Sequence, residues 1–149
     1  MFKHILVSTD GSKLSAKAIT AAVKLAKTTG AKLTGVYVVA PFTPPVYGEG
    51  AAYVTGEFNP KRYKEAMQKA SRHALSAIEI EAQTSGVTCN TLSATGDLPW
   101  EAIIHAAKTK KCDLIVMASH GRRGLAGLLL GSETTKVLTH SKIPVLVCR

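Results

Sequence analysis

Several features that would direct an interpretation are missing from this 149-residue sequence. No apolar run reaches the roughly 18 residues that a membrane-spanning helix needs, so no membrane partner is expected. The three cysteines, Cys89, Cys112 and Cys148, form no Cys-x-x-Cys pair, which argues against a zinc or dithiol site. The segment after Met1 also lacks the basic region, apolar stretch and cleavage site of a signal peptide. We therefore expect a cytoplasmic protein with reduced thiols.

Two common phosphate-binding motifs are missing as well. No G-x-x-x-x-G-K-[ST] occurs, which excludes an ordinary P-loop protein. The pair Gly48-Glu49-Gly50 lacks the third glycine of G-x-G-x-x-G and does not follow the first predicted strand. Dinucleotide-dependent redox chemistry is therefore disfavoured.

Positive charge is abundant, since 19 Lys and Arg against 10 Asp and Glu give a net charge of +9. Such an excess keeps nucleic acid among the conceivable partners. The lysines are dispersed, however: one group falls along a predicted helix between residues 13 and 27, and another between 61 and 69. A solvated face is favoured, and nucleic acid ranks last among the expected partners.

Strand-like and helix-like segments alternate along the whole chain. Strands are predicted over Ile5–Val7, Leu33–Val39, Val87–Ala94, Leu114–Ala118 and Pro144–Cys148. Helices are predicted to begin near Ser12 or Ser15, Pro60, Asp97 or Leu98, and Ser132. The length suits a single domain over residues 1–149. The order βαβαβαβαβ predicts right-handed crossovers and an open, doubly wound, five-stranded parallel sheet of the Rossmann-like kind.

The segment 40–59 interrupts this alternation. It contains three prolines, three glycines and four aromatic residues, without clear periodicity. About twenty residues is long for a connection between elements. The segment is either a functional flap or a mobile surface loop, and the sequence leaves both interpretations open.

Polar and glycine-rich residues follow the predicted strands at one edge of the sheet. Ser8-Thr9-Asp10 follows the first strand, Val38-Val39 ends the second, and Ala118-Ser119-His120-Gly121 ends and follows the fourth. Ligands of doubly wound sheets bind beyond these carboxyl ends, where the winding direction switches. Glycine allows a ligand close to the backbone, and a helix start at Ser132 would add unpaired N–H donors. Residues 114–132 therefore predict an anion site.

After Gly121, nine residues lead to Gly131-Ser132. Here the sequence resembles the universal stress protein family, whose nucleotide-binding members carry G-x2-G-x9-G-[ST] at this place. The resemblance covers the whole chain, through I-L-V-S-T-D-G-S, V-Y-V-V, M-A-S-H-G-R-R-G, L-G-S-E-T-T-K-V-L and I-P-V-L-V. It implies an adenine nucleotide alpha hydrolase-like fold and a site for ATP, or for ADP or AMP, with Mg²⁺ as a possible companion.

The resemblance also implies roles for matching positions. Ser8, Thr9 and Asp10 would lie by the adenine, the ribose or a metal ion, and Asp10 is the candidate Mg²⁺ ligand through water. Val38, beside Val39, would contact the adenine. The ribose, the base and the phosphates would be lined by Met117, Ala118, Ser119, His120, Gly121, Arg122, Gly131, Ser132 and Glu133. The hydroxyl of Ser132 would in addition cap its helix.

Two departures from the family pattern bear on binding. Ala118 stands at the family's first glycine, and its methyl group costs little only if the backbone φ there is negative. Glu133 suits the first turn of a helix but repels phosphate unless a metal ion or its orientation intervenes. Arg122 and Arg123 either pair with phosphate or project into water. For His120, a positioning or solvent-exposed role is favoured over catalysis, because no nucleophile or orienting carboxylate is fixed beside it.

The sequence thus predicts a cytoplasmic, nucleotide-binding regulatory protein without a catalytic residue. The resemblance also implies a homodimer, in which Ile143–Val147 would pair with its copy as an edge strand. Two alternatives stay open. One is a slow ATP hydrolase or phosphotransferase that uses the same site, and the other is a dimeric interaction protein of the same fold that has lost nucleotide binding.

Overall fold

The computed structural model describes residues 1–43, 59–121 and 130–149. Within them, five strands and four helices alternate: β1 (His4–Thr9), α1 (Lys13–Thr29), β2 (Lys32–Val39), α2 (Pro60–Ser85), β3 (Cys89–Thr95), α3 (Pro99–Thr109), β4 (Leu114–Ala118), α4 (Ser132–His140) and β5 (Val145–Cys148). The strands pair in parallel in the order β3-β2-β1-β4-β5. The predicted open, doubly wound parallel sheet is confirmed.

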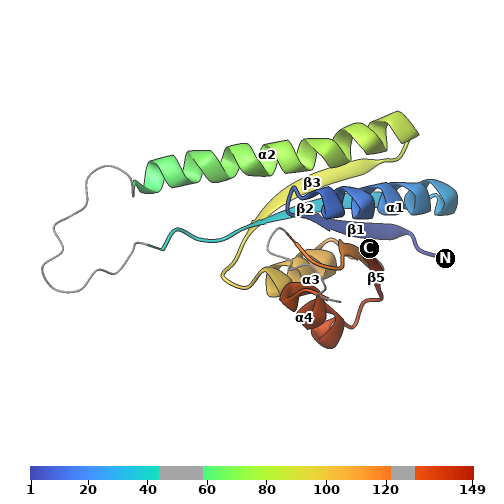
Figure 1. Cartoon of the computed structure of the whole chain (residues 1–149). Helices are drawn as coiled ribbons and strands as arrows, with labels where there is room; N and C mark the ends of the chain where they lie inside the picture. The colour runs from blue at the N-terminus through green and yellow to red at the C-terminus, as the bar shows by residue number, and fades with distance from the viewer. Residues whose placement is uncertain (44–58, 122–129) are drawn as a thin grey trace, which may run out of the picture.

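Helices cover both faces of this sheet, with α1 and α2 on one face and α3 and α4 on the other (Figure 1). The central strand β1 shows why its sequence is continuously apolar. Ile5 and Val7 pack toward α1 and α2, Leu6 packs toward α3 and α4, and all three are 0% exposed. A strand that is covered on both faces needs apolar residues at successive positions, because successive side chains point to opposite faces.

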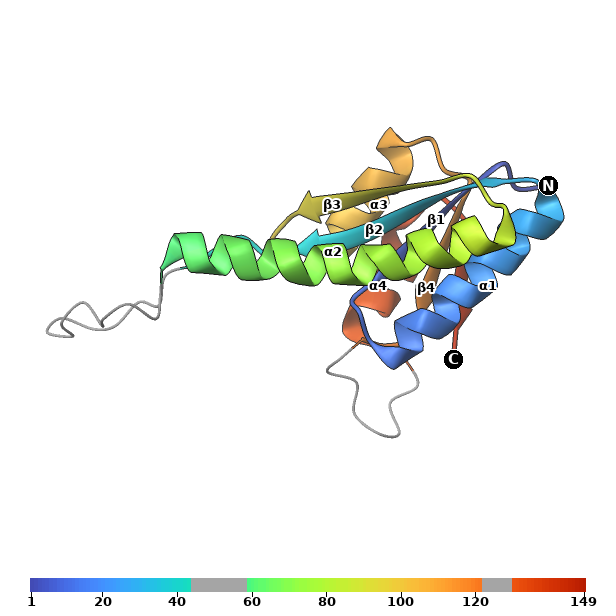
Figure 2. The ribbon, with the colours of Figure 1, turned by 90° about the horizontal axis from the view of Figure 1, so that it is seen from above.

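Local signals set the ends of the two long helices, and the predicted helix starts near Ser12 and at Pro60 are confirmed. The hydroxyl of Ser12 accepts from the N–H of Ser15 at 3.1 Å and caps α1, and Gly30 ends that helix with a φ of 70°. The side chain of Asn59 accepts from the N–H of Lys61 at 2.8 Å and caps α2, with Pro60 as its first residue. The first half of α2 runs out beyond the sheet (Figure 2), and its buried residues begin at Ser71.

The part of segment 40–59 between residues 44 and 58 lies outside the described residues, so both interpretations of it stay predictions. Among the described residues, no helix is both long enough and apolar enough to cross a membrane.

The three cysteines, all described, are free thiols, as predicted. Burial raises the pKa of Cys112 to about 11, with a smaller contribution from the neighbouring charge of Asp113. Burial also raises the pKa of Cys89 and of Cys148. Since the thiolate is the reactive form, all three side chains are weak nucleophiles at neutral pH.

A buried histidine lies at the amino end of β1, remote from the carboxyl edge of the sheet. His4 is 8% exposed, and its Nε2 lies 2.7 Å from Oγ1 of Thr34. Its Nδ1 is buried and has no hydrogen-bond partner in the described part of the chain. Burial, and then the positive charge of Lys32, lower the pKa of His4 below its usual value. The fold therefore favours the neutral imidazole.

We predict that His4 makes folding sensitive to mild acid. As the pH falls through about 6.5, the unfolded chain takes up a proton on this histidine before the folded chain does, so the free energy of unfolding decreases. In His4→Gln, the loss of stability between about pH 7.5 and pH 5.5 should be smaller than in the wild type, as measured by urea unfolding at the two pH values. His73→Gln, at an exposed position of α2, is the matched control and should keep the wild-type pH dependence. An unchanged pH dependence in His4→Gln would contradict the prediction.

Candidate functional site

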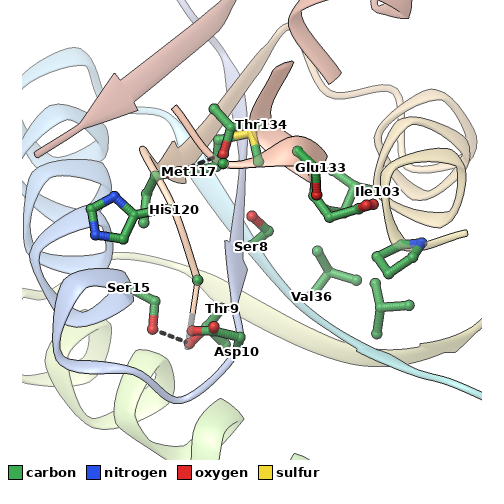
Figure 3. Close-up of a pocket in the computed structure, with 16 residues that line it drawn as sticks. Ser8, Thr9, Asp10, Ser15, Val36, Ile103, Met117, His120, Glu133 and Thr134 are labelled. Carbon is green, nitrogen blue, oxygen red and sulfur yellow. Dashed lines mark hydrogen bonds between the residues drawn. The ribbon is translucent and has the colours of Figure 1, made fainter. Parts of the chain in front are cut away.

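A cavity of about 600 Å³ opens where the carboxyl ends of β1, β2 and β4 meet the first turns of α3 and α4 (Figure 3). This volume lies within the range of small-molecule sites. Its lining consists of Ser8, Thr9, Asp10, Ser15, Val36, Val38, Pro99, Ile103, Met117, Ala118, His120, Gly121, Gly131, Ser132, Glu133 and Thr134. The strand order makes β1 and β4 neighbours, and the chain leaves them toward opposite faces of the sheet. The cavity therefore lies at the switch point, where doubly wound sheets bind ligands.

Apolar and polar residues both line this cavity and are partly separated, with Glu133 on the same side as Ile103 (Figure 3). Val36 and Ile103 lie on one side in Figure 3, and Asp10 and His120 lie on the other. Val38 and Pro99 also line it, and both belong to the segments that carry Val36 and Ile103. A ligand with a flat apolar ring and a polar or charged tail would match this division.

The turn after β1 is held by hydrogen bonds from its own side chains. Oγ1 of Thr9 lies 3.0 Å from Oγ of Ser15 and accepts from the N–H of Gly11 at 3.1 Å. Oδ1 of Asp10 accepts from the N–H of Ser12 at 3.0 Å. These bonds place the Asp10 carboxylate at the cavity.

Gly121 lets the loop after β4 approach this carboxylate. A Cβ at position 121 would lie 2.6 Å from Oδ2 of Asp10, which is closer than two such atoms can pack. The glycine is therefore needed for contact between the β1 and β4 ends, whatever its relation to a ligand. Arg122 and Arg123, the next two residues, lie outside the described residues.

Gly131 makes a second close contact, at the start of α4. A Cβ there would lie 3.1 Å from both Cα and Cβ of His120, and the N–H of Gly131 donates to the carbonyl of Ser119 at 2.7 Å. This N–H is therefore already engaged. The donors that α4 leaves without an intrahelical partner are the N–H groups of Ser132, Glu133 and Thr134.

The prediction that Ser132 caps its helix is wrong. Gly131 is the N-cap, with φ −73° and ψ 158°, and no side chain bonds the first turn of α4. Ser132 is the first helical residue, and a side chain at the cap position would be crowded by the backbone of His120. Its hydroxyl forms part of the cavity wall instead.

Ala118 does not distort the backbone. It is the last residue of β4, and the only described non-glycine residue with positive φ is Lys111. The carbonyl of Ala118 accepts from Oγ1 of Thr134 at 2.9 Å, which ties β4 to the first turn of α4. The backbone φ of Ala118 is therefore negative, which is the case in which its methyl group costs little.

The carboxylate of Glu133 bridges α4 to α3. Oε2 accepts from the N–H of Trp100 at 3.0 Å, and Oε1 lies 3.3 Å from Nζ of Lys136. The cap residue of α3, Leu98, forms no side-chain bond, so Glu133 supplies the cap from another helix. Its negative charge is offset by a helix N-terminus and by an ammonium group. The orientation of the Glu133 carboxylate thus reduces the repulsion of phosphate that its position in the sequence predicts.

The cavity contains every predicted site residue except Val39, Ser119 and Arg122. Val39 packs toward α1 and α2, because side chains alternate along β2 and Val38 points toward α3. Ser119 is 1% exposed and forms the layer behind the wall, where its Oγ lies 3.2 Å from Nδ1 of His120. Arg122 lies outside the described residues.

The sequence did not indicate five lining residues: Ser15, Val36, Pro99, Ile103 and Thr134. Val36 lies two positions before Val38 and therefore on the same face of the sheet. The alternation of side chains along the strand could have identified it as a lining residue. Pro99 and Ile103 reach the site only because α3 packs over β2, which no local pattern reveals.

The described residues contain no group of three or more His, Cys, Asp or Glu side chains that could hold a metal ion. Mg²⁺ is commonly held by one or two carboxylates together with substrate phosphates. Asp10 fits that role only in the company of a ligand's phosphates. No carboxylate among the described residues hydrogen-bonds to His120, so its ring lacks the orienting partner of a general base.

Comparison with known proteins agrees with the fold and with the sequence motifs. The model of the universal stress protein family matches residues 1–149. Universal stress protein YxiE of Bacillus subtilis is 37% identical over 150 residues, which span 100% of both chains. The structure of universal stress protein UspA from Lactobacillus plantarum is similar with a TM-score of 0.77 and 30% identity, covering 99% of this chain and 97% of that one. The universal stress protein from Archaeoglobus fulgidus in complex with dAMP has the same fold, with a TM-score of 0.68, 16% identity and coverage of 99% and 98%.

We predict that the bridge from Glu133 stabilises the fold. Glu133→Ala leaves the first turn of α3 without a side-chain acceptor and should lower the free energy of unfolding by about 1 kcal/mol, in the range of lost helix caps. Urea unfolding measures the change. Glu133→Gln is the matched variant, since its amide oxygen can still accept from Trp100, and it should lose less. Equal losses in both variants would show that the hydrogen bond to Trp100 does not contribute.

Proposed function

The chain belongs to the universal stress protein family, and on that premise we propose that its cavity binds an adenine nucleotide, with ATP as the leading candidate and ADP or AMP as alternatives. In this proposal the protein is a cytoplasmic regulatory module of the stress response, and nucleotide occupancy changes its surface. Its three free thiols suit a reducing compartment.

The observation that carries the proposal is the division of the cavity at the switch point. Its apolar side, with Val36, Val38 and Ile103, offers a slot for a flat base. Its lining also contains Ser132 at the start of α4, where unpaired N–H groups and the helix dipole favour phosphate. Together the apolar slot and this helix start match the two ends of a nucleotide. The dAMP complex of the A. fulgidus protein supports the idea that this fold can hold an adenine nucleotide.

Four cavity residues would then contribute to binding, each in its own way. The hydroxyl of Ser132 and the N–H groups of Ser132 and Glu133 would donate to phosphate oxygens. Gly131 would act by packing rather than by donating, because its N–H is bonded to Ser119. Asp10 would hold Mg²⁺ together with those phosphates, and the ion would neutralise part of their charge.

We also propose that the chain forms a homodimer through β5, which is the last strand at one edge of the sheet. The carbonyls of Pro144 and Cys148 accept from β4, at 2.9 Å from Ile115 N and 2.7 Å from Ser119 N. Because backbone groups alternate along a strand, those of Val145 and Val147 point toward the open edge. Leu146 is 40% exposed beside them. An apolar strand with an open edge can pair with its own copy.

Calorimetry tests nucleotide binding. The nucleotide-stripped protein should bind ATP, ADP or AMP with and without Mg²⁺. Ser132→Ala should weaken binding about tenfold, as expected for a lost hydrogen bond to a charged group. Gly131→Val should abolish binding, because its side chain would push His120 into the site. Circular dichroism and thermal unfolding show whether each variant is folded.

Further variants and outcomes distinguish nucleotide binding from the two alternatives, an interaction protein and a hydrolase. Gly86→Asn, at a left-handed position that ends α2 remote from the cavity, should bind like the wild type. Ala118→Gly should change affinity by less than about threefold, because alanine already keeps a negative φ there. No heat with any adenine nucleotide would sink the proposal in favour of an interaction protein. Release of ADP that Ser132→Ala or Asp10→Ala abolishes would favour the hydrolase.

Sedimentation velocity tests the dimer. Val147→Pro removes a backbone N–H from the open edge of β5 and leaves the carbonyls that bond β4 in place, so the variant should be a folded monomer. Leu146→Pro removes an N–H on the β4 side and should destabilise the fold instead. A monomeric wild-type protein, or a dimeric Val147→Pro variant, would contradict pairing through β5.

A further inference from the structure

Positive charge that is dispersed in the sequence gathers on one face of the folded chain. The two helices on that face, α1 and α2, lie against each other (Figure 2). In α1, four lysines stand without any acidic residue, and α2 has five basic residues against three acidic ones. Each helix on the other face is neutral, with one acidic and one basic residue in α3 and likewise in α4.

The lysines of α1 form a straight stripe, which we call the α1 lysine stripe: Lys13, Lys17, Lys24 and Lys27. At about 100° per residue they fall within an arc of roughly 80°. All four are exposed, and the buried residues of α1 lie on the opposite side of the helix. With a rise of about 1.5 Å per residue, the stripe is about 21 Å long.

The basic residues of α2 lie in its first half, between Lys61 and Arg72. This half extends beyond the sheet (Figure 2), so its side chains reach solvent around most of the helix. Of the three acidic residues of α2, Glu65 lies in this first half, which keeps an excess of four positive charges, and Glu79 and Glu81 lie in the second half. The overhang thus enlarges the positively charged surface on the α1 side of the sheet.

The basic residues at the starts of these two helices do not stabilise them, whereas Lys27, in the last turn of α1, suits the helix dipole. Cations in a first helical turn oppose the helix dipole, yet Lys13 begins α1, Lys61 and Arg62 lie in the first turn of α2, and neither turn contains an acidic residue. No lysine of the stripe forms an ion pair with another described residue, and the pair between Lys136 and Glu133 lies on the other face. The stripe is therefore not neutralised within the described structure.

We propose that the α1 lysine stripe, assisted by the α2 overhang, binds the phosphate backbone of duplex DNA without reading its sequence. About 21 Å of a duplex presents on the order of six phosphates per strand, enough for four lysines. The residues between the lysines on the outer face, Ala16, Thr20 and Thr28, are small. They provide no bulky apolar anchor for a lipid surface and no aromatic platform for a single strand. An acidic protein partner would need an apolar centre, and the α1 lysine stripe contains none; the exposed apolar residue of this face, Ile80, lies in the second half of α2.

Fluorescence anisotropy with a labelled, mixed-sequence duplex of about 20 base pairs tests the proposal. The wild type should bind at about 50 mM salt with a Kd on the order of 10⁻⁵ M, and the logarithm of its affinity should fall with log salt at a slope of about −3.6 if four lysines contact phosphate. Lys17→Gln/Lys24→Gln removes two of these contacts and should reduce the slope by about 1.8.

Lys108→Gln/Lys110→Gln is the matched control, with the same loss of charge at exposed positions behind the sheet, and it should keep the wild-type slope. The proposal is overturned by the absence of salt-dependent binding, by an equal reduction in both variants, or by binding to vesicles with anionic lipids that exceeds binding to the duplex. Neither variant changes a residue of the cavity. The outcome of nucleotide calorimetry on these variants is therefore independent of the outcome of the DNA-binding test.

Discussion

The parallel pairing of β1 with β4 is the constraint on which the rest of this structure depends. It places two strands side by side that are separated by more than a hundred residues, with Ile5 opposite Leu114 and Val7 opposite Val116. Because the chain leaves them toward opposite faces, their carboxyl ends diverge and a cavity opens between the connections. The functional site is thus a consequence of strand order, and its residues belong to six elements, β1, α1, β2, α3, β4 and α4, and to the loops after β1 and β4.

Short-range packing then determines the shape of that cavity. Gly121 approaches the carboxylate of Asp10, and Gly131 approaches the backbone of His120, so a methyl group at either position would force its neighbour to shift. Thr134 bonds the carbonyl of Ala118, and Glu133 bonds the first turn of α3. These contacts hold the starts of α3 and α4 against the sheet. A change in the cavity would therefore alter the α3–α4 face. This coupling is the physical basis for a regulatory surface in the proposed function.

The two faces of the sheet carry different surfaces. Helices α3 and α4 each carry one acidic and one basic residue and adjoin the cavity, whereas the α1–α2 face carries the lysine stripe and the overhang. A ligand that enters at the carboxyl edge and a polyanion that lies along α1 would not compete for the same residues. The fold therefore has room for two independent binding surfaces on one small domain.

Local chemistry by itself determined the elements. The caps Ser12 and Asn59, the terminating Gly30 and the continuous apolar run of β4 act within a few residues, so the helices and strands could be read directly from the sequence. The glycine motif and the family resemblance located most of the cavity. Tertiary structure alone decided which residues meet across long separations: Ile103 beside Val38, Glu133 on the α3 N-terminus, Gly131 rather than Ser132 at the cap, and the lysines of two helices on one face. These outcomes depend on how helices pack over the sheet, and packing is a property of the assembled core that no short stretch of sequence encodes.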